Sequence, residues 1–233
     1  MSRLLSGLRS ARGFTLVELL VATTVGVGLL LGAFTISDAF RHAQTRVSDR
    51  SEAIARGRTA MEQIVQQLRS QVCLGPGYPA IAYGGDSQIT FYGDLANSTF
   101  VPQKRDLAFA SGALTERTYT GTPSSSGAPF TFASTPSRTR VVADKLALRT
   151  QSGVNVPFFR YYMFDGNDPI RPSKLLTTPL SASDAARVVQ VSISYSALPS
   201  RAGAPSSAGE PFTANVYVRT ADPTDPDHSP LCI

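Results

Sequence analysis

Enzymatic chemistry would need a nucleophile, a base or a phosphate-binding loop in a recognisable pattern. The sequence contains no GxSxG elbow, P-loop, HExxH helix or glycine-rich dinucleotide loop. Its two histidines, His42 and His228, lie far apart, one in a helical pattern and one in a proline-rich tail. The sequence therefore predicts a protein that is not an enzyme and that holds no cofactor.

Oxygen-bearing side chains gather at two predicted turns, where calcium would be the metal to consider, because it takes six to eight oxygen ligands. The two groups are Asp165, Asn167 and Asp168, and Asp222, Asp225 and Asp227. Neither follows the spacing of an EF-hand loop. Solvated turn residues are the simpler interpretation, so we expect no metal, and calcium remains the alternative.

Basic side chains could bind nucleic acid, and Arg138, Arg140, Lys145 and Arg149 form the densest group. Alternation along a strand would divide these charges between two faces. The formal net charge is +5, but removal of the first 13 residues, with their three arginines, would lower it to +2. A nucleic-acid partner is therefore possible, but the charge does not require one.

The sequence has two cysteines, Cys73 and Cys232, which are too few for a zinc cluster. An even number of cysteines fits one disulfide in an oxidising compartment. We predict that Cys73 and Cys232 form this bond and tie the tail to the end of a long helix.

The elements that position these side chains begin with a membrane span. Residues 1–13 are short and basic, and the apolar residues 19–37 are long enough to cross about 30 Å of hydrocarbon. Arginines before the span place the N-terminus in the cytoplasm, so the rest of the chain is expected outside the inner membrane. The run exceeds the apolar core of about 7–15 residues in a secretory signal peptide.

Glu18 is the one ionisable side chain between Gly13 and Asp38. A carboxylate deep in lipid costs up to a few kcal/mol. We therefore expect Glu18 to have a partner in the membrane.

Residues 13–21, GFTLVELLV, resemble the cleavage and methylation motif of type IV prepilins and type II secretion pseudopilins, and the expected basic leader precedes them. The resemblance implies that prepilin peptidase cuts between Gly13 and Phe14 and methylates the Phe14 amine. It also implies that Glu18 faces the N-terminal amine of a neighbouring subunit, which makes other pilin or pseudopilin subunits the partners. The alternative is a plain signal anchor with a chance glutamate.

Helical spacing continues past the membrane span. An apolar residue recurs every seventh position, and the sequence predicts one helix from Phe14 to about Val72, with residues 14–37 in the membrane and an amphipathic half, 38–73. The recurring residues are Phe40, Val47, Ile54, Met61 and Leu68. We expect this stripe to pack on the chain's own head; a coiled coil is the alternative. Gly28 and Gly32 form a small-residue pair that would allow close helix contact.

Residues 74–233 change to short β-like runs between turns, which predicts an extracytoplasmic head built on an antiparallel sheet. The predicted strands are 88–92, 140–148, 158–164, 188–195 and 212–219, and the predicted loops are 120–129 and 199–211. Alternation in 189–195 indicates a sheet that is wet on one face. The expected fold is α+β, a long N-terminal helix packed on this head.

The C-terminal third also resembles minor subunits of the PilW and J-like pseudopilin group. The resemblance rests on the run YYMFDG at 161–166, the valine-rich 187–195 and the ending VYVR at 216–219. It implies a minor structural subunit of a type IV pilus or of a type II secretion-like filament. The alternative is a DNA- or surface-binding minor pilin of a competence or adhesion filament.

Overall fold

The computed structural model describes residues 15–75, 77–94, 101–124, 129–165, 172–200 and 209–219. The chain divides into two compact units, one up to Ser48 and one from Asp49 onward. The helix α1, Leu16–Arg69, contributes to both units, and each unit is described separately.

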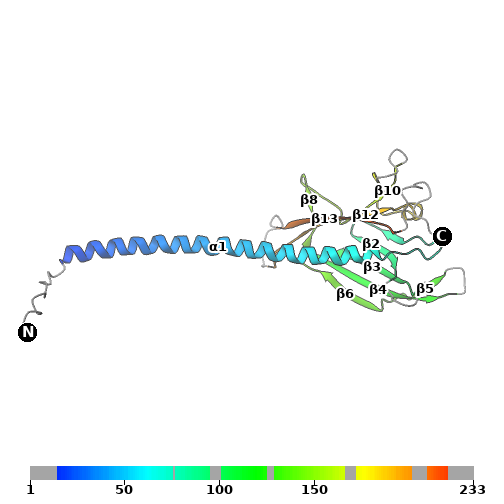
Figure 1. Ribbon diagram of the computed structural model, residues 1–233, viewed down its shortest axis with the longest axis horizontal. Helices are drawn as coiled ribbons and strands as arrows, with labels where there is room; N and C mark the ends of the chain where they lie inside the picture. Colours follow the sequence, from blue (N-terminus) through cyan, green and yellow to red (C-terminus); the bar gives the residue numbers. More distant parts are fainter. Residues whose placement is uncertain are drawn as a thin grey trace, which may run out of the picture. The chain divides into compact units, whose positions relative to one another are not determined.

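The first unit is the N-terminal part of α1, which forms the predicted helix through the apolar run (Figure 1). Its large apolar side chains from Leu16 to Ile36 are at least 56% exposed, so the unit does not cover its own apolar surface. Among the described helices, α1 is the one that is long and apolar enough to cross a membrane. The prediction of one long helix is confirmed.

The second unit contains two antiparallel sheets. The first sheet has the order β1-β2-β3-β4-β5, and β6 pairs with β4. Its strands are β1 (Ile81–Gly84), β2 (Gln88–Gly93), β3 (Gln103–Ala110), β4 (Ala113–Pro123), β5 (Phe130–Phe132) and β6 (Arg138–Ala143). Neighbours along the chain are also neighbours in the sheet from β1 to β5, which makes this sheet a meander.

The second sheet has the order β11-β10-β12-β13, and β7 pairs with β12. Its strands are β7 (Leu146–Ala147), β10 (Phe159–Met163), β11 (Lys174–Leu175), β12 (Gln190–Ala197) and β13 (Glu210–Tyr217). A separate hairpin joins β8 (Thr150–Gln151) to β9 (Val154–Asn155), and a short helix, α2 (Ala182–Ala185), precedes β12. All described strand pairs are antiparallel, which confirms the predicted α+β head.

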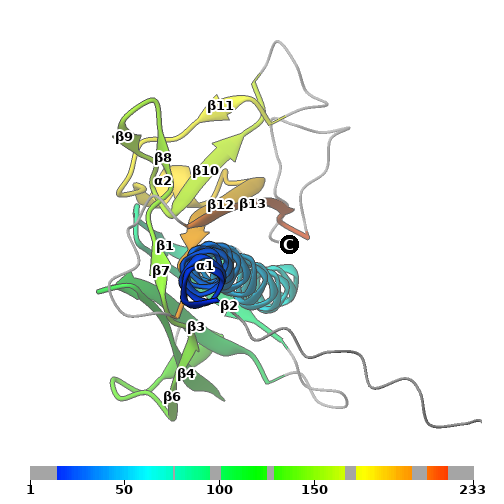
Figure 2. The same ribbon diagram turned by 90° about the vertical axis from the view of Figure 1, so that its left-hand side faces the viewer.

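The last turns of α1 lie between the two sheets, with β12 and β13 on one side and β2, β3 and β4 on the other (Figure 2). Ile64 and Leu68 are fully buried in a core that includes apolar residues of both sheets. The helix end is tied to the first sheet through the backbone, because Val72 N–H donates to the Tyr92 carbonyl at 2.9 Å. The end of α1 thus packs against both sheets.

A glycine lets β13 approach the helix closely. A Cβ atom at Gly57 would lie 2.2 Å from Cε2 of Phe212, far inside the normal contact distance of about 3.5 Å between carbon atoms. Phe212 stacks on Tyr195 with ring centroids 5.7 Å apart, and the Tyr195 hydroxyl donates to the Gly57 carbonyl at 2.7 Å. We call Gly57, Tyr195 and Phe212 the glycine notch.

The predicted helical stripe is covered only in its second half. Leu68 is buried, and Ile54 and Met61 are partly buried, but Phe40 and Val47 are 72% and 69% exposed. The predicted packing of the helix on the head is confirmed, and within the second unit it involves Ile54, Met61 and Leu68 of the stripe. Burial begins at Ala53, although β13 already contacts the helix at Arg50, whose Nε lies 2.6 Å from Glu210 Oε1.

The prediction that the sheet is exposed to solvent on one face is wrong at strand β12. All eight of its residues are buried, including Ser192, Ser194 and Ser196. The strand is central, between β10 and β13, and Ser192 lies between two longer residues, Arg160 of β10 and Asn215 of β13. Ser194, for example, is hydrogen-bonded to Thr213 of β13 at 3.0 Å.

Candidate functional site

The helix α1 begins with a reciprocal pair of hydrogen bonds between Thr15 and Glu18. The Glu18 backbone N–H donates to Thr15 Oγ1 at 3.2 Å, and the Thr15 backbone N–H donates to Glu18 Oε2 at 3.4 Å. This is a capping box, which satisfies two N–H groups that have no partner in the helix itself. The T-x-x-E spacing before an apolar run could have predicted it from the sequence, and our sequence analysis missed it.

The capping box gives Glu18 a hydrogen-bonding role within its own helix. Its carboxylate already has a local role at the helix start, although the hydrogen bonds that it accepts are long. The carboxylate still has capacity for a further, stronger donor. Gly13 and Phe14 lie outside the described residues, so cleavage between them, and pairing of Glu18 with an amine, stay predictions.

The span also carries the predicted small-residue pair. At Gly28 and Gly32 a Cβ atom would meet nothing within 4 Å. Among the described residues, none packs closely enough at either position to require a glycine. A helix from outside the chain would be needed to make use of their small size.

Cys73 follows the helix and packs against the hydrophobic core. It has no free thiol. Its predicted partner, Cys232, lies outside the described residues, so the pairing of the two stays a prediction.

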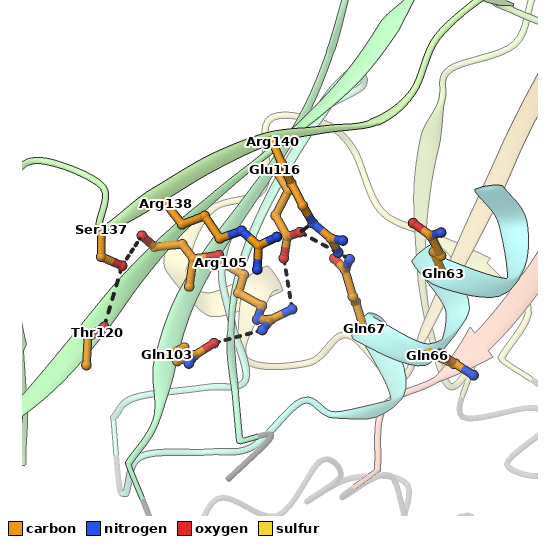
Figure 3. Close-up of a pocket in the computed structure, with 11 residues that line it drawn as sticks. Gln63, Gln66, Gln67, Gln103, Arg105, Glu116, Thr120, Ser137, Arg138 and Arg140 are labelled. Atoms are coloured by element: carbon orange, nitrogen blue, oxygen red, sulfur yellow. Dashed lines mark hydrogen bonds and ion pairs between the residues drawn. The ribbon is translucent and has the colours of Figure 1, made fainter. Parts of the chain in front are cut away.

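A buried charge cluster connects the end of α1 to the first sheet (Figure 3). Its centre is the Glu116 carboxylate of β4, whose side chain is 3% exposed. The Arg105 Nη1 atom donates to it at 2.8 Å, Arg140 Nε forms a second ion pair, and Gln67 Nε2 of the helix donates at 3.3 Å. Antiparallel pairing creates this arrangement, because residue 116 lies beside 107 of β3 and opposite 140 of β6.

The cluster forms the floor of a pocket of about 560 Å³ between α1 and strands β3, β4 and β6. The pocket is lined by Gln63, Gln66, Gln67, Gln103, Arg105, Glu116, Thr118, Thr120, Ser137, Arg138 and Arg140. Three guanidinium groups face a single carboxylate, which leaves an excess of two positive charges. Burial lowers the pKa of Arg105, as do the nearby charges of Arg140 and Arg138, and Glu116 opposes the change. No local sequence pattern predicts this pocket, because its residues come from four separate segments.

The four predicted basic residues do not form one strip. Arg138 and Arg140 are two positions apart on β6 and both line the pocket, so they share a face. Arg149 instead donates to Thr213 of the second sheet at 2.8 Å, and Lys145 lies in a left-handed turn with φ of 53°. These four residues of the described chain thus form no continuous basic strip.

The two acidic turns are almost entirely outside the described residues, with Asp165 as the exception. Among the described residues, no group of three or more His, Cys, Asp or Glu side chains could hold a metal ion. His42 is exposed and lies 3.5 Å from Asp38, one turn earlier on α1.

Comparisons with known proteins point to the N-terminus. The family model described as the prokaryotic N-terminal methylation motif matches residues 8–34. No curated protein matches the chain. Among solved structures, the chain is similar to one from the complex of GspK, GspI and GspJ of the enterotoxigenic Escherichia coli type 2 secretion system.

That likeness has a TM-score of 0.39 at 13% identity and covers 73% of this chain and 99% of the other. Similarity this low does not indicate a shared function. The N-terminal motif is a signal for processing rather than a set of reacting groups, which agrees with the expectation that the chain is not an enzyme. Together with the apolar helix, it agrees with an inner-membrane location before assembly. The chain thus carries the prokaryotic N-terminal methylation motif at residues 8–34, at the start of a long helix that precedes an antiparallel β head.

Proposed function

We propose that this chain is a minor structural subunit of a type IV pilus or of a type II secretion-like filament. In this proposal prepilin peptidase cuts after Gly13 and methylates Phe14, and the subunit assembles with other pilins or pseudopilins through its N-terminal helix. The observation that carries the proposal is the methylation motif at residues 8–34 on a helix whose apolar side chains are uncovered.

The uncovered surface supports assembly as well as anchoring. A bilayer would cover the apolar residues from Leu16 to Ile36, but Phe40 and Val47 lie beyond the predicted span and are exposed too. Phe40 and Val47 continue the seven-residue spacing of the stripe that is buried farther along the helix. Neighbouring subunits that pack along α1 would cover them.

The first experiment tests processing. Intact mass spectrometry of the membrane-extracted protein should find a chain that begins at Phe14 and carries one methyl group on its amine. A mature N-terminus beyond Ala22 would contradict the proposal and indicate a secretory signal instead.

The second experiment separates the two roles of Glu18. A capping box accepts glutamine as well as glutamate, so Glu18→Gln keeps the helix cap but removes the negative charge. If Glu18 faces the Phe14 amine of a neighbour in a low-dielectric filament core, the variant leaves an unpaired cation there, which is costly. We expect Glu18→Gln and Glu18→Val to be inserted and cleaved normally but to be depleted from sheared filaments.

Processed protein in the membrane is compared with protein in filaments for each variant. Glu62→Gln, on the exposed face of the same helix, is the matched control and should assemble like the wild type. Equal incorporation of Glu18→Gln and wild type would show that the cap, not the charge, is what Glu18 provides.

A further inference from the structure

The pocket over Glu116 has the features of an anion site. Its three arginines exceed its single carboxylate, and the rest of its lining consists of amide and hydroxyl groups. A volume of about 560 Å³ lies within the range of small-molecule sites, but the walls carry no large apolar or aromatic side chain. A ligand of this pocket must therefore be small, polar and negatively charged.

The arginines differ in how far their hydrogen-bonding capacity is used. Arg105 is almost fully buried and donates to Glu116 and Gln103. Arg140 uses its Nε atom on Glu116, and its side chain is 37% exposed, which leaves its outer N–H groups accessible. Arg138 is exposed and has no hydrogen-bond or ion-pair partner among the described residues. In Figure 3 its side chain extends toward the cluster from the same strand as Arg140.

Two polar atoms at the floor of the pocket lack a hydrogen-bond partner among the described residues. Arg105 Nε and Gln67 Oε1 are buried without a hydrogen-bond partner in the described structure. Arg105 Nε is a donor, which an oxyanion that reaches the floor would accept from, whereas Gln67 Oε1 is an acceptor, which a water would donate to. Natural structures leave few such groups unpaired, and those that remain call for an explanation.

We propose that this pocket binds a small oxyanion, a carboxylate or phosphate group, between Arg138 and Arg140. The planar guanidinium fork matches both groups, and either would neutralise the excess positive charge. The neighbouring Thr118 hydroxyl supplies a further donor. The hydroxyl of Ser137 already donates to the Thr118 carbonyl at 2.9 Å, and that of Thr120 donates to Ser137 Oγ at 3.5 Å. The inference does not depend on the filament function, because it rests on the head alone.

The test uses the full processed chain in detergent, titrated at low ionic strength with inorganic phosphate or with succinate by isothermal calorimetry. Saturable binding of at least one anion is expected, with phosphate alone indicating a phosphate group and succinate alone a carboxylate. Arg138→Gln should weaken binding by about tenfold or more, because one charge-assisted contact is lost. Arg187→Gln removes an exposed arginine outside the pocket and should bind like the wild type.

Three results would overturn the proposal. They are no saturable binding of either anion, unchanged binding in Arg138→Gln, or equal weakening by Arg138→Gln and Arg187→Gln. The last would show attraction to general surface charge rather than a site. Thermal melting without ligand checks that both variants are folded, and no loss of stability is expected from Arg138→Gln.

Discussion

Replacing Gly57 with alanine should destabilise the protein, although alanine is the better helix former. In an open helical position this substitution would stabilise by about 1 kcal/mol. At Gly57 the new Cβ would lie 2.2 Å from Cε2 of Phe212, so the ring would have to retreat by roughly 1.3 Å to reach normal contact. That movement disturbs the stack on Tyr195, whose hydroxyl is bonded to the Gly57 carbonyl.

Overpacking of this kind costs about 1–3 kcal/mol. The gain in helix propensity offsets part of the cost, and we expect a net loss of about 1 kcal/mol. For a chain of this size the loss corresponds to a fall in melting temperature of about 3 °C. Thermal unfolding of the full chain in detergent, followed by tyrosine fluorescence because the sequence has no tryptophan, measures the change.

A double variant makes the test decisive. Once Phe212→Ala has removed the ring, the alanine at position 57 meets little, so Gly57→Ala should then be neutral or stabilising. Gly26→Ala, where a Cβ meets nothing within 4 Å, is the matched control and should not lower the melting temperature. If Gly57→Ala stabilises the otherwise wild-type protein, or has the same effect with and without Phe212, the close approach does not matter for stability.

Three further predictions concern the head. Burial raises the pKa of the Tyr161 and Tyr195 phenols above the ordinary value of 10.0, so the folded state keeps protons that the unfolded state loses. The stability that these two phenols contribute should be constant below about pH 10 and be lost above it, and the fall in stability should be less steep in Tyr195→Phe. Glu116→Gln should destabilise the protein by about 3 kcal/mol in urea unfolding, because two guanidinium groups lose their anion. Arg140→Gln should destabilise it less, because the Arg140 side chain is partly exposed. A larger loss in Arg140→Gln than in Glu116→Gln would refute the buried network. Peptide mapping without reduction should recover a Cys73–Cys232 disulfide, which would stabilise by several kcal/mol through closure of a long loop; two alkylated thiols would remove the prediction.

The sequence predicts the elements whose apolar residues follow a regular period. The long helix is recognisable because α1 keeps its spacing over many turns, and β2, β10, β12 and β13 are recognisable by β-branched and aromatic residues. The predicted segment 140–148 is divided between β6 and β7, because the left-handed Lys145 turns the chain from one sheet to the other.

The two longest strands of the first sheet were missed for a physical reason. The inward face of β4 carries Leu114, Glu116 and Thr118, and β3 buries Arg105. A charged residue in the interior is tolerable only when its partner lies opposite, and a partner on another strand is invisible to a local pattern. The segment 120–129 was predicted as a loop, but β4 continues to Pro123. The pocket was missed with these strands, whereas the residues at the N-terminus form a local signal.

The two sheets differ in when they can form during synthesis, which proceeds from the N-terminus to the C-terminus. The meander from β1 to β5 joins neighbours, so each strand finds its partner within a few residues of synthesis. The second sheet cannot form until β12 has been synthesised, because β12 pairs with β7, β10 and β13. Tyr195 of β12 then bonds to Gly57 of the helix, 138 positions earlier in the chain. We therefore expect a late folding step in which the second sheet closes over the exposed flank of α1. Until that step the side of α1 that the second sheet covers, which includes Gly57, is open to solvent.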